Sequence, residues 1–447
     1  MSDDERPDVP DAGGSGDRPT RDIDPSELTP VPDADPAELA EPVLGTGELS
    51  PRQPALRAGR RMPWNDLLVT VAAFVLALVV GGILMVVSDT SVRPKFAYFF
   101  ARPSDALDAS WHKVFTAYSA LFEGAVGSWG AFTNSTAQAA PLICAGLGVA
   151  VAFRAGLFNI GAQGQAIWGS ILAAWVGFNF HGLPLVLHLP LAILAGLVGG
   201  GVWGGIAGVL KAKAGAHEVI VTIMLNYVAA GLLAWLLTTS AFMRPGRTDP
   251  ISPIVDWNAT FPRMANSQLH LGFVLALLAA VLVWWLMERT ALGFRIKAVG
   301  ANPRAAATAG MSVARVTTIT MAIAGLLGGL AGVQSALGPL AGASPTPLTS
   351  GLVGTVGFDA ITVALLGRSR PLGTVLAGLL FGALHAGGIQ MQSAAATPLA
   401  LTAVLQALIV LFVAAPVLIR TMLPFLKQRR TPRRRAAAAG ADQGGAA

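Results

Sequence analysis

Residues 189–210 read LPLAILAGLVGGGVWGGIAGVL and contain no charged side chain. A helix needs about 20 apolar residues to cross a hydrocarbon layer about 30 Å thick, and this run is long enough. Within it, Gly196, Gly200, Gly204 and Gly208 recur at every fourth position and so share one helix face. Small residues at this spacing let membrane helices approach closely, so the run predicts a packed transmembrane helix. A ligand that approaches the bare backbone is the alternative use of these glycines.

Similar apolar segments fill most of the remaining chain, including a second glycine-rich one around Gly325, Gly328, Gly329 and Gly332. The pattern predicts an all-α polytopic membrane protein with about ten transmembrane helices. The expected spans are residues 66–88, 137–153, 157–180, 189–210, 217–240, 270–287, 313–337, 350–366, 372–391 and 398–419.

The composition agrees with this fold class. Of the 447 residues, 53% are hydrophobic and only 13% are charged, whereas ordinary soluble domains carry about 25% charged residues. This excludes a typical soluble enzyme. The single cysteine, Cys144, excludes an intrachain disulfide and a metal site built from several cysteines.

The composition divides the chain into three regions. Residues 1–50 hold 14 acidic and 3 basic side chains, and proline is frequent among them. We therefore expect residues 1–61 to be a disordered acidic leader, and the segment lacks the pattern of a cleavable signal peptide. Residues 62–420 form the expected transmembrane domain. Residues 421–447 form a basic, alanine-rich tail that we expect at the anionic inner leaflet.

Basic residues orient the expected spans. After residue 50, 21 lysines and arginines fall on one side of the membrane in this arrangement, and 7 fall on the other. Cytoplasmic loops carry the excess of Lys and Arg, so both termini are expected in the cytoplasm. The seven basic residues expected outside are Arg93, Lys95, Arg102, Lys113, Arg244, Arg247 and Arg263.

Several common activities lack their motifs. The chain has no G-x-x-x-x-G-K-[ST] nucleotide loop, no H-E-x-x-H and no G-x-S-x-G. Ionisable residues inside the expected spans are few, chiefly Glu218, Asp359 and His385, and each is a functional hypothesis because burying it is costly. Glu218 lies close to cytoplasmic lysines, which favours an ion pair at the membrane surface. For His385, a satisfied position in the core is the expectation.

The longest polar segment between spans, residues 288–313, reads ERTALGFRIKAVGANPRAAATAGMSV. Asn302 and Pro303 predict a helix start, and Gly310 predicts its end. The short helix between them is rich in alanine, which suits docking into a groove on another protein. An ordinary positively charged loop would explain the basic residues but not this small helix.

This segment carries a resemblance. LGFRIKAVGANPRAAATAGM and the following ITMAIAGLLGGLAG resemble the cytoplasmic coupling segment of permease subunits in ABC importers for simple sugars, branched-chain amino acids and nucleosides. Three further stretches resemble the nucleoside branch, namely GLFNIGAQGQ at 156–165, HEVIVTIMLNYVA at 217–229 and FDAITVALLGRSRPLG at 358–373. The resemblance covers roughly residues 65–420. Members of this branch often carry an acidic residue where this chain has Gln163.

The resemblance implies a transport subunit of a bacterial cell membrane that is not itself an enzyme. A separate ABC ATPase would use ATP and Mg, and this chain would hold no cofactor. A second, paralogous permease subunit would complete the membrane path, and an extracytoplasmic binding protein would deliver the nucleoside. Lipid is the only other expected contact, and nucleic acid is not one. The implied ATPase-coupling residues are Gly300, Asn302, Pro303, Arg304, Ala306 and Gly310.

Polar residues near the spans are candidates for the substrate path. Asn159, Gln163 and Gln165 carry amides that can both donate and accept hydrogen bonds, which suits a ribose or a nucleobase. They could equally form hydrogen bonds with backbone groups where a helix is interrupted within the bundle. Glu218 and Asn226 lie eight residues apart on nearly one helix face, where interhelical contacts are the alternative. Asp359 could pair with a basic group or contact substrate, and the structural role is favoured.

Three other functions stay open. The first keeps the architecture but carries a simple sugar such as ribose. The second is a gradient-driven secondary transporter or channel, which the scarcity of intramembrane charges disfavours. The third is a polytopic membrane enzyme, for which no nucleophile, base and orienting group can be assembled from the sequence.

Overall fold

The structure is a computed structural model, and it describes residues 64–264, 267–338 and 346–414. These residues are helical, apart from loops and one isolated antiparallel bridge between Arg263 and His270. The prediction of an all-α polytopic protein is therefore confirmed. The expected leader, residues 1–61, and the expected tail, residues 421–447, lie outside the described residues.

Thirteen α-helices and two short 3-10 helices make up the described part. In chain order they are α1 (Trp64–Ser88), η2 (Arg93–Tyr98), α2 (Pro103–Val126), α3 (Trp129–Arg154), α4 (Ala162–Asn179), α5 (Leu185–Ala214), α6 (Glu218–Leu236), η3 (Trp257–Ala259), α7 (Leu271–Arg289), α8 (Ala291–Ala301), α9 (Pro303–Thr308), α10 (Val313–Leu337), α11 (Val356–Leu366), α12 (Pro371–Ala395) and α13 (Leu399–Ala414).

Seven of these helices are long and apolar enough to cross a membrane, namely α1, α3, α5, α6, α7, α10 and α12. Two more, α11 and α13, are apolar but shorter. Every predicted span contains a helix, and the prediction for residues 313–337 matches α10 at both ends. Helix α4 begins five residues later than the predicted span, after a turn, and α11 begins six residues later.

The region between the first two predicted spans contains helices that the prediction did not include. Residues 89–136 contain the whole of α2 and the first turns of α3. Helix α2 carries Asp105, Asp108, Lys113 and Glu123 among its apolar residues. These charged residues lower the mean hydropathy of α2 below that expected of a membrane span, although the helix is 24 residues long.

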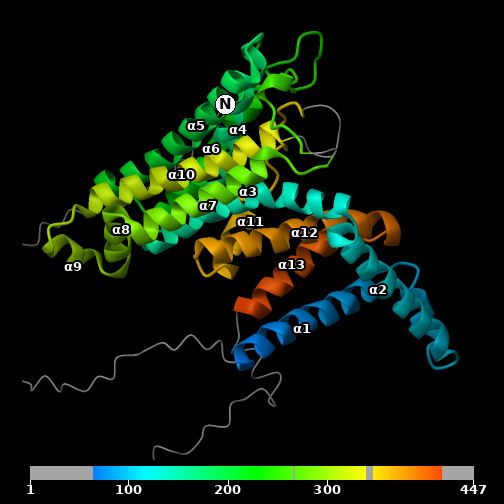
Figure 1. Cartoon of the computed structure of the whole chain (residues 1–447). Helices are drawn as coiled ribbons and strands as arrows, with labels where there is room; N and C mark the ends of the chain where they lie inside the picture. Colours follow the sequence, from blue (N-terminus) through cyan, green and yellow to red (C-terminus); the bar gives the residue numbers. More distant parts are fainter. Residues whose placement is uncertain (1–63, 265–266, 339–345, 415–447) are drawn as a thin grey trace, which may run out of the picture. The chain divides into compact units, whose positions relative to one another are not determined.

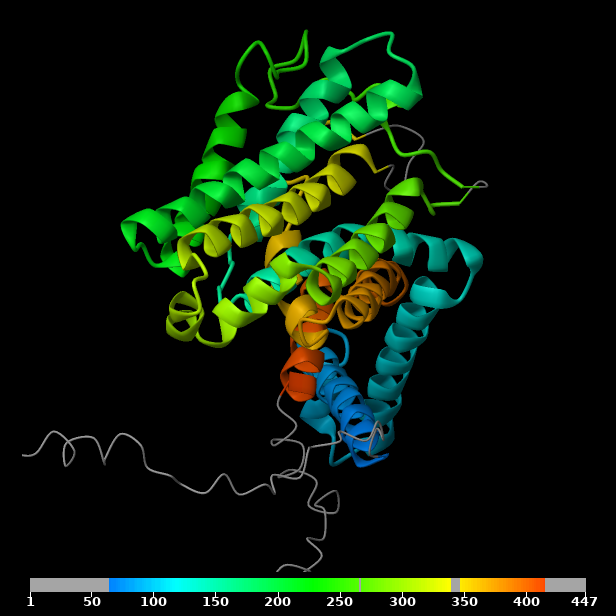
Figure 2. The same ribbon diagram turned by 60° about the vertical axis from the view of Figure 1, so that its left-hand side comes forward.

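Helix α10 lies at the centre of the packing. It contacts α5, α4 and α3, while α12 contacts α3 and α2. Figures 1 and 2 show α5 and α10 side by side from both directions, and α1 beside α13. The largest buried cluster lies among α3, α4, α5, α7 and α10. A smaller cluster joins α1, α2, α12 and α13.

The predicted glycine face of residues 189–210 is confirmed as a packing surface. A Cβ atom at Gly200 would collide with the carbonyl oxygen of Gly325 on α10, and one at Gly325 would collide with the carbonyl oxygen of Gly200. At Gly204 a Cβ would lie 2.5 Å from the carbonyl oxygen of Met321. The two backbones are thus in direct contact, which only glycine permits.

We expect Gly200→Ala to destabilise the protein, because the added methyl group must push α5 away from α10. Overpacking of this kind costs about 1–3 kcal/mol. The matched control is Gly231→Ala on α6, where no atom lies within 4 Å of the added Cβ. There alanine favours the helix by up to about 1 kcal/mol. Thermal unfolding of both variants in detergent checks this prediction. Equal unfolding midpoints for the two variants would contradict the close contact between α5 and α10.

Candidate functional site

The turn between α3 and α4 is built around Asn159, whose side chain is fully buried. Its carbonyl oxygen, Oδ1, accepts hydrogen bonds from the backbone nitrogen of Gly161 at 3.0 Å and from Nε2 of Gln165 at 3.3 Å. Its Nδ2 donates to Oε1 of Gln165 at 3.2 Å. The two amides therefore pair with each other and hold the turn against the first turn of α4.

Asn226 on α6 secures the same turn from the other side. Its Oδ1 accepts a hydrogen bond from the backbone nitrogen of Gly164 at 2.8 Å, and its Nδ2 donates to the carbonyl oxygen of Ile160 at 3.0 Å. The first backbone N–H groups of a helix have no partner within the helix. Asn226 thus satisfies one of these groups at the start of α4.

Gln163 connects α4 to the segment that leads into α11. Its Nε2 donates to the carbonyl oxygen of Gly354 at 2.7 Å, and its Oε1 accepts from the backbone nitrogen of Gly357 at 2.8 Å. Gly354 has a φ of +53°, the left-handed region that glycine tolerates best. Both ends of the Gln163 amide are therefore used to hold a second break between helices.

The structure brings four predicted path residues together and shows their amides bonded within the protein. Asn159, Gln163, Gln165 and Asn226 are all buried, and their amides bind the backbone or one another. This is the alternative in which amides satisfy interrupted backbone at membrane depth. The cluster positions α4 and α11, and it leaves little bonding capacity for a substrate.

Glu218 lies at the first residue of α6 and pairs with Lys211 of α5, with 2.6 Å between Oε2 and Nζ. The loop between these residues joins the two helices. The predicted alternative for Glu218, an ion pair near the lysines, is therefore confirmed. Its eight-residue spacing from Asn226 does not bring the two side chains into one site.

Asp359 occupies a different environment on α11. It is half-buried, and its Oδ2 accepts a hydrogen bond from the hydroxyl of Thr355 at 2.8 Å. His385 of α12 is near enough to interact with it electrostatically. The expectation of a core position for His385 is wrong, because its side chain is exposed. A half-buried acid and an exposed histidine on apolar helices are costly in lipid, so this face should meet water or protein.

The short helix predicted after Asn302 is confirmed as α9. The Asn302 side chain accepts hydrogen bonds from the backbone nitrogens of Arg304 at 3.0 Å and Ala305 at 3.1 Å, which caps the helix. Pro303 is its first residue. Gly310, with a φ of +80°, ends the segment as predicted.

The six predicted coupling residues do not share one exposed surface. Ala306 is 4% exposed and belongs to the main core. A Cβ at Gly300 would lie 3.0 Å from Cα of Ala155 and would collide with the Arg154 carbonyl oxygen. Both residues therefore pack α8 and α9 onto the chain itself. The exposed alanines of α9 are instead Ala305 and Ala307, next to the exposed Arg304 and Thr308; Ala301 before the helix and Ala309 after it are exposed as well.

Sequence reasoning missed helix α8 and the cavity beside it. Thr290 caps α8 by accepting a hydrogen bond from the backbone nitrogen of Gly293 at 3.1 Å, a signal that the sequence does contain. The cavity, of about 510 Å³, lies between α8 and the start of α10, and Arg295 and Arg315 line it. It adjoins Gly310 at the end of the α9 segment. Among the described residues, no group of three metal-ligating side chains comes together.

Residues 131–414 match the family described as the permease component of the branched-chain amino acid transport system. A guanosine ABC transporter permease, NupP of Bacillus subtilis, is 38% identical over 367 residues, which cover 82% of this chain and 98% of that protein.

Two further relatives have different named cargoes. A nucleoside ABC transporter permease, NupB of Lactococcus lactis, is 35% identical over 69% of this chain and 86% of its own length. A glucose ABC transporter permease, TsgB13 of Haloferax volcanii, is 35% identical over 66% and 79%. No solved structure matches. The chain belongs to the family of ABC transporter permeases whose model is the permease component of the branched-chain amino acid transport system.

Proposed function

We propose that this chain forms the membrane path for nucleosides in an ATP-driven ABC importer. The observation that carries the proposal is the 38% identity to the guanosine permease NupP across 98% of that protein's length. The nucleoside permease NupB supports the same cargo. Seven helices suited to cross a membrane, and two shorter apolar ones, suit a subunit that encloses such a path.

A sugar cargo is the second candidate, because the relative TsgB13 is named for glucose. It matches a smaller share of this chain than NupP does, 66% against 82%. A nucleoside also contains a sugar, so part of the recognition could be shared. The difference between the two candidates therefore lies in whether the base is required for transport.

The importer we propose has further subunits. NupQ, a second guanosine permease from the organism that has NupP, is 30% identical over 55% of this chain. NupC accompanies NupB in Lactococcus lactis in the same way. These pairs support a paralogous second permease beside this chain. A separate ATPase would use ATP and Mg, a binding protein would deliver substrate from outside, and both termini of this chain would lie in the cytoplasm of a bacterial cell.

The ATPase-facing surface in this proposal is the exposed side of α9. Ala305 and Ala307 present small side chains there, so the helix backbone can come close to a partner groove. Asn302 and Gly310 fix its two ends, and Ala306 fixes it to the core. A small helix held at three points moves with the rest of the chain when its partner moves.

The substrate path in this proposal runs along the exposed side of α11 and α12. Asp359 uses one carboxylate oxygen on Thr355, and the other oxygen can accept hydrogen bonds from ribose hydroxyls or from base N–H groups. His385 adds a second polar group on the neighbouring helix. The second permease subunit would cover this face, which explains polar side chains on otherwise apolar helices.

For the cargo, we expect uptake of labelled guanosine in cells that contain this chain with its ATPase, and no uptake without the ATPase. Excess unlabelled nucleosides should compete, and excess glucose or ribose should not. Competition by the sugars alone would indicate a sugar importer. Uptake that persists without any ATPase would contradict the importer and favour a gradient-driven carrier.

For the coupling surface, we expect Ala307→Trp to abolish substrate-stimulated ATP hydrolysis and uptake, because the indole blocks close approach of the ATPase. The folded permease should remain in the membrane. The control is Ala306→Trp, whose buried position predicts loss of folded protein instead. If Ala307→Trp transports at the normal rate, α9 is not the docking helix.

For the substrate path, Asp359→Asn should lower the uptake rate at limiting nucleoside by at least about tenfold, the effect of losing about 1.4 kcal/mol. The matched control is Gln163→Glu, a change within the amide cluster, which should reduce the thermal stability of the protein because Gly354 then loses its donor. Uptake and thermal unfolding, measured on both variants, separate the two roles. Unchanged uptake in Asp359→Asn would place the path elsewhere.

A further inference from the structure

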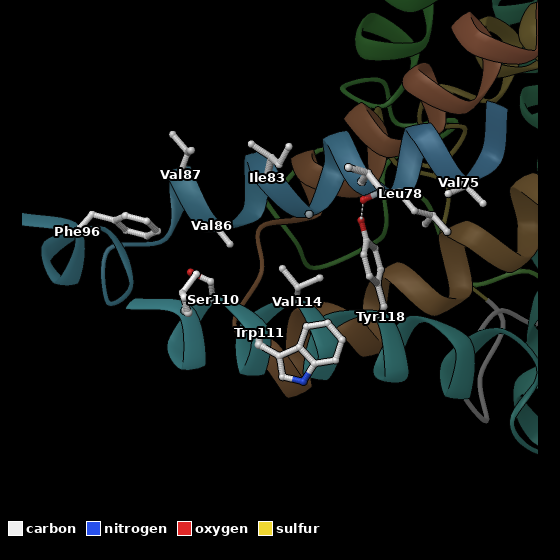
Figure 3. A pocket seen from close by; sticks show the side chains of 13 residues that line it. Val75, Leu78, Ile83, Val86, Val87, Phe96, Ser110, Trp111, Val114 and Tyr118 are labelled. Carbon is white, nitrogen blue, oxygen red and sulfur yellow. Dashed lines mark hydrogen bonds between the residues drawn. The ribbon is translucent and has the colours of Figure 1, made fainter. Parts of the chain in front are cut away.

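An apolar groove of about 690 Å³ lies between α1 and α2, away from the residues discussed so far (Figure 3). One wall comes from α1, the other from α2, and Phe96 of η2 lies at one end. Figure 3 shows Val86 of α1 and Val114 of α2 on facing sides of the gap. The groove is open along its length to the surroundings of the protein.

The side chains that line the groove are almost all apolar. Only Ser110, Trp111 and Tyr118 carry polar atoms; the two hydroxyls are occupied, and the Trp111 indole can donate a single hydrogen bond. The Tyr118 hydroxyl donates to the carbonyl oxygen of Leu78 at 2.5 Å, and the Ser110 hydroxyl donates to that of Ala106 at 2.6 Å. A polar molecule such as a nucleoside would lose many hydrogen bonds to water here and could regain only the one that the Trp111 indole donates. The lining therefore favours hydrocarbon as the occupant.

The length of the groove fits one lipid chain. Its lining on α1 runs from Val75 to Val87, which is about 18 Å at a helical rise of 1.5 Å per residue. One leaflet of a membrane has about 15 Å of hydrocarbon, half of the total thickness.

Positive charge lies at the Phe96 end. Residues 93–102 contain Arg93, Lys95 and Arg102 but no acidic residue. Within the described residues, none of these three bases forms an ion pair. Two of them, Arg93 and Arg102, are exposed. A phosphate group placed beside Phe96 would thus find free cationic donors.

The acidic residues nearby do not cancel this charge. Asp89 is already bound by Lys113, with 2.5 Å between Oδ2 and Nζ. The hydrogen bonds from Lys113 and Ser91 hold the pKa of the Asp89 carboxyl well below its usual range, so this carboxylate stays ionised. Asp105 and Asp108 lie on α2 away from the helix face that carries the groove residues Leu107, Ser110, Trp111 and Val114.

We propose that this groove binds one acyl chain of an anionic phospholipid, with the phosphate held by Arg93, Lys95 and Arg102. The apolar lining holds the acyl chain of any phospholipid, whatever its head group. The basic residues then select for a negatively charged head group. A lipid in this place fills the gap between α1 and α2, so it completes the packing of the first two helices.

The test is to purify the full chain, together with its partner subunits, from vesicles with equal amounts of phosphatidylglycerol and phosphatidylcholine of matched acyl chains. Mass spectrometry then measures the lipid that remains bound after detergent washing. We expect about one phospholipid per chain, with phosphatidylglycerol several-fold enriched over phosphatidylcholine. Equal retention of the two lipids, or no retained lipid, would overturn the proposal.

Variants separate the groove from the rest of the surface. Ile83→Trp fills the groove from an exposed position and should remove most of the bound lipid, and Val87→Trp serves the same purpose if that protein does not fold. The matched control is Val71→Trp, also exposed on α1 but outside the groove, which should keep the lipid. If Ile83→Trp and Val71→Trp retain the same amount, the groove is not the lipid site.

A second set of variants tests the proposed binding of the lipid phosphate by the three basic residues. Replacing Arg93, Lys95 and Arg102 together by Gln should abolish the preference for phosphatidylglycerol while phosphatidylcholine stays bound. Replacing Arg93 and Arg102 by Lys should keep the preference, because the charge is retained. A preference that survives the Gln substitutions would overturn the assignment of the phosphate to these bases. Cross-linking of Ile83 to a second permease subunit, in place of lipid, would overturn the whole proposal.

Discussion

Direct contact between the backbones of α5 and α10 is the constraint on which the rest of the structure depends. In a membrane, lipid tails are as apolar as leucine, so helices gain little by burying apolar side chains against each other. Close van der Waals contact must hold them instead. The Gly200 and Gly325 contact provides it, and α10 then presents its other glycines to α4. Gly329 lies against Gly169, and Gly332 lies against the carbonyl oxygen of Ala166.

The amide cluster depends on this arrangement. Because α4 lies so close to α10, its first turn is buried and its free N–H groups cannot reach water. Asn159 and Asn226 accept hydrogen bonds from backbone N–H groups of this turn, and Gln163 does the same for the start of α11. Neutral amides suit this task, since each can donate and accept at once. An acidic residue at position 163 would lose the donor that binds Gly354.

The sequence predicts the long apolar helices well, because hydropathy alone identifies segments such as 313–337. It predicts the α5 glycine face for the same reason, since the fourfold spacing is a local pattern. Helix α2 was missed because its charged residues lower its hydropathy, although they lie on an amphipathic helix. The inward position of Ala306 and the exposure of His385 could not be predicted, since each depends on which neighbouring helix packs against that face.

If α9 docks on an ATPase, as we propose, the positions of Gly300 and Ala306 determine how a movement of that ATPase would reach the membrane. Gly300, at the end of α8, touches the backbone of Arg154 and Ala155, and Gly156 lies against Gly300 in turn. These residues lead directly into the turn that carries Asn159. Because both contacts are between backbones, they have no flexible side chain that could absorb a displacement. In the importer that we propose, a shift of α9 would therefore be passed to the start of α4, and through Gln163 to α11, where Asp359 lies.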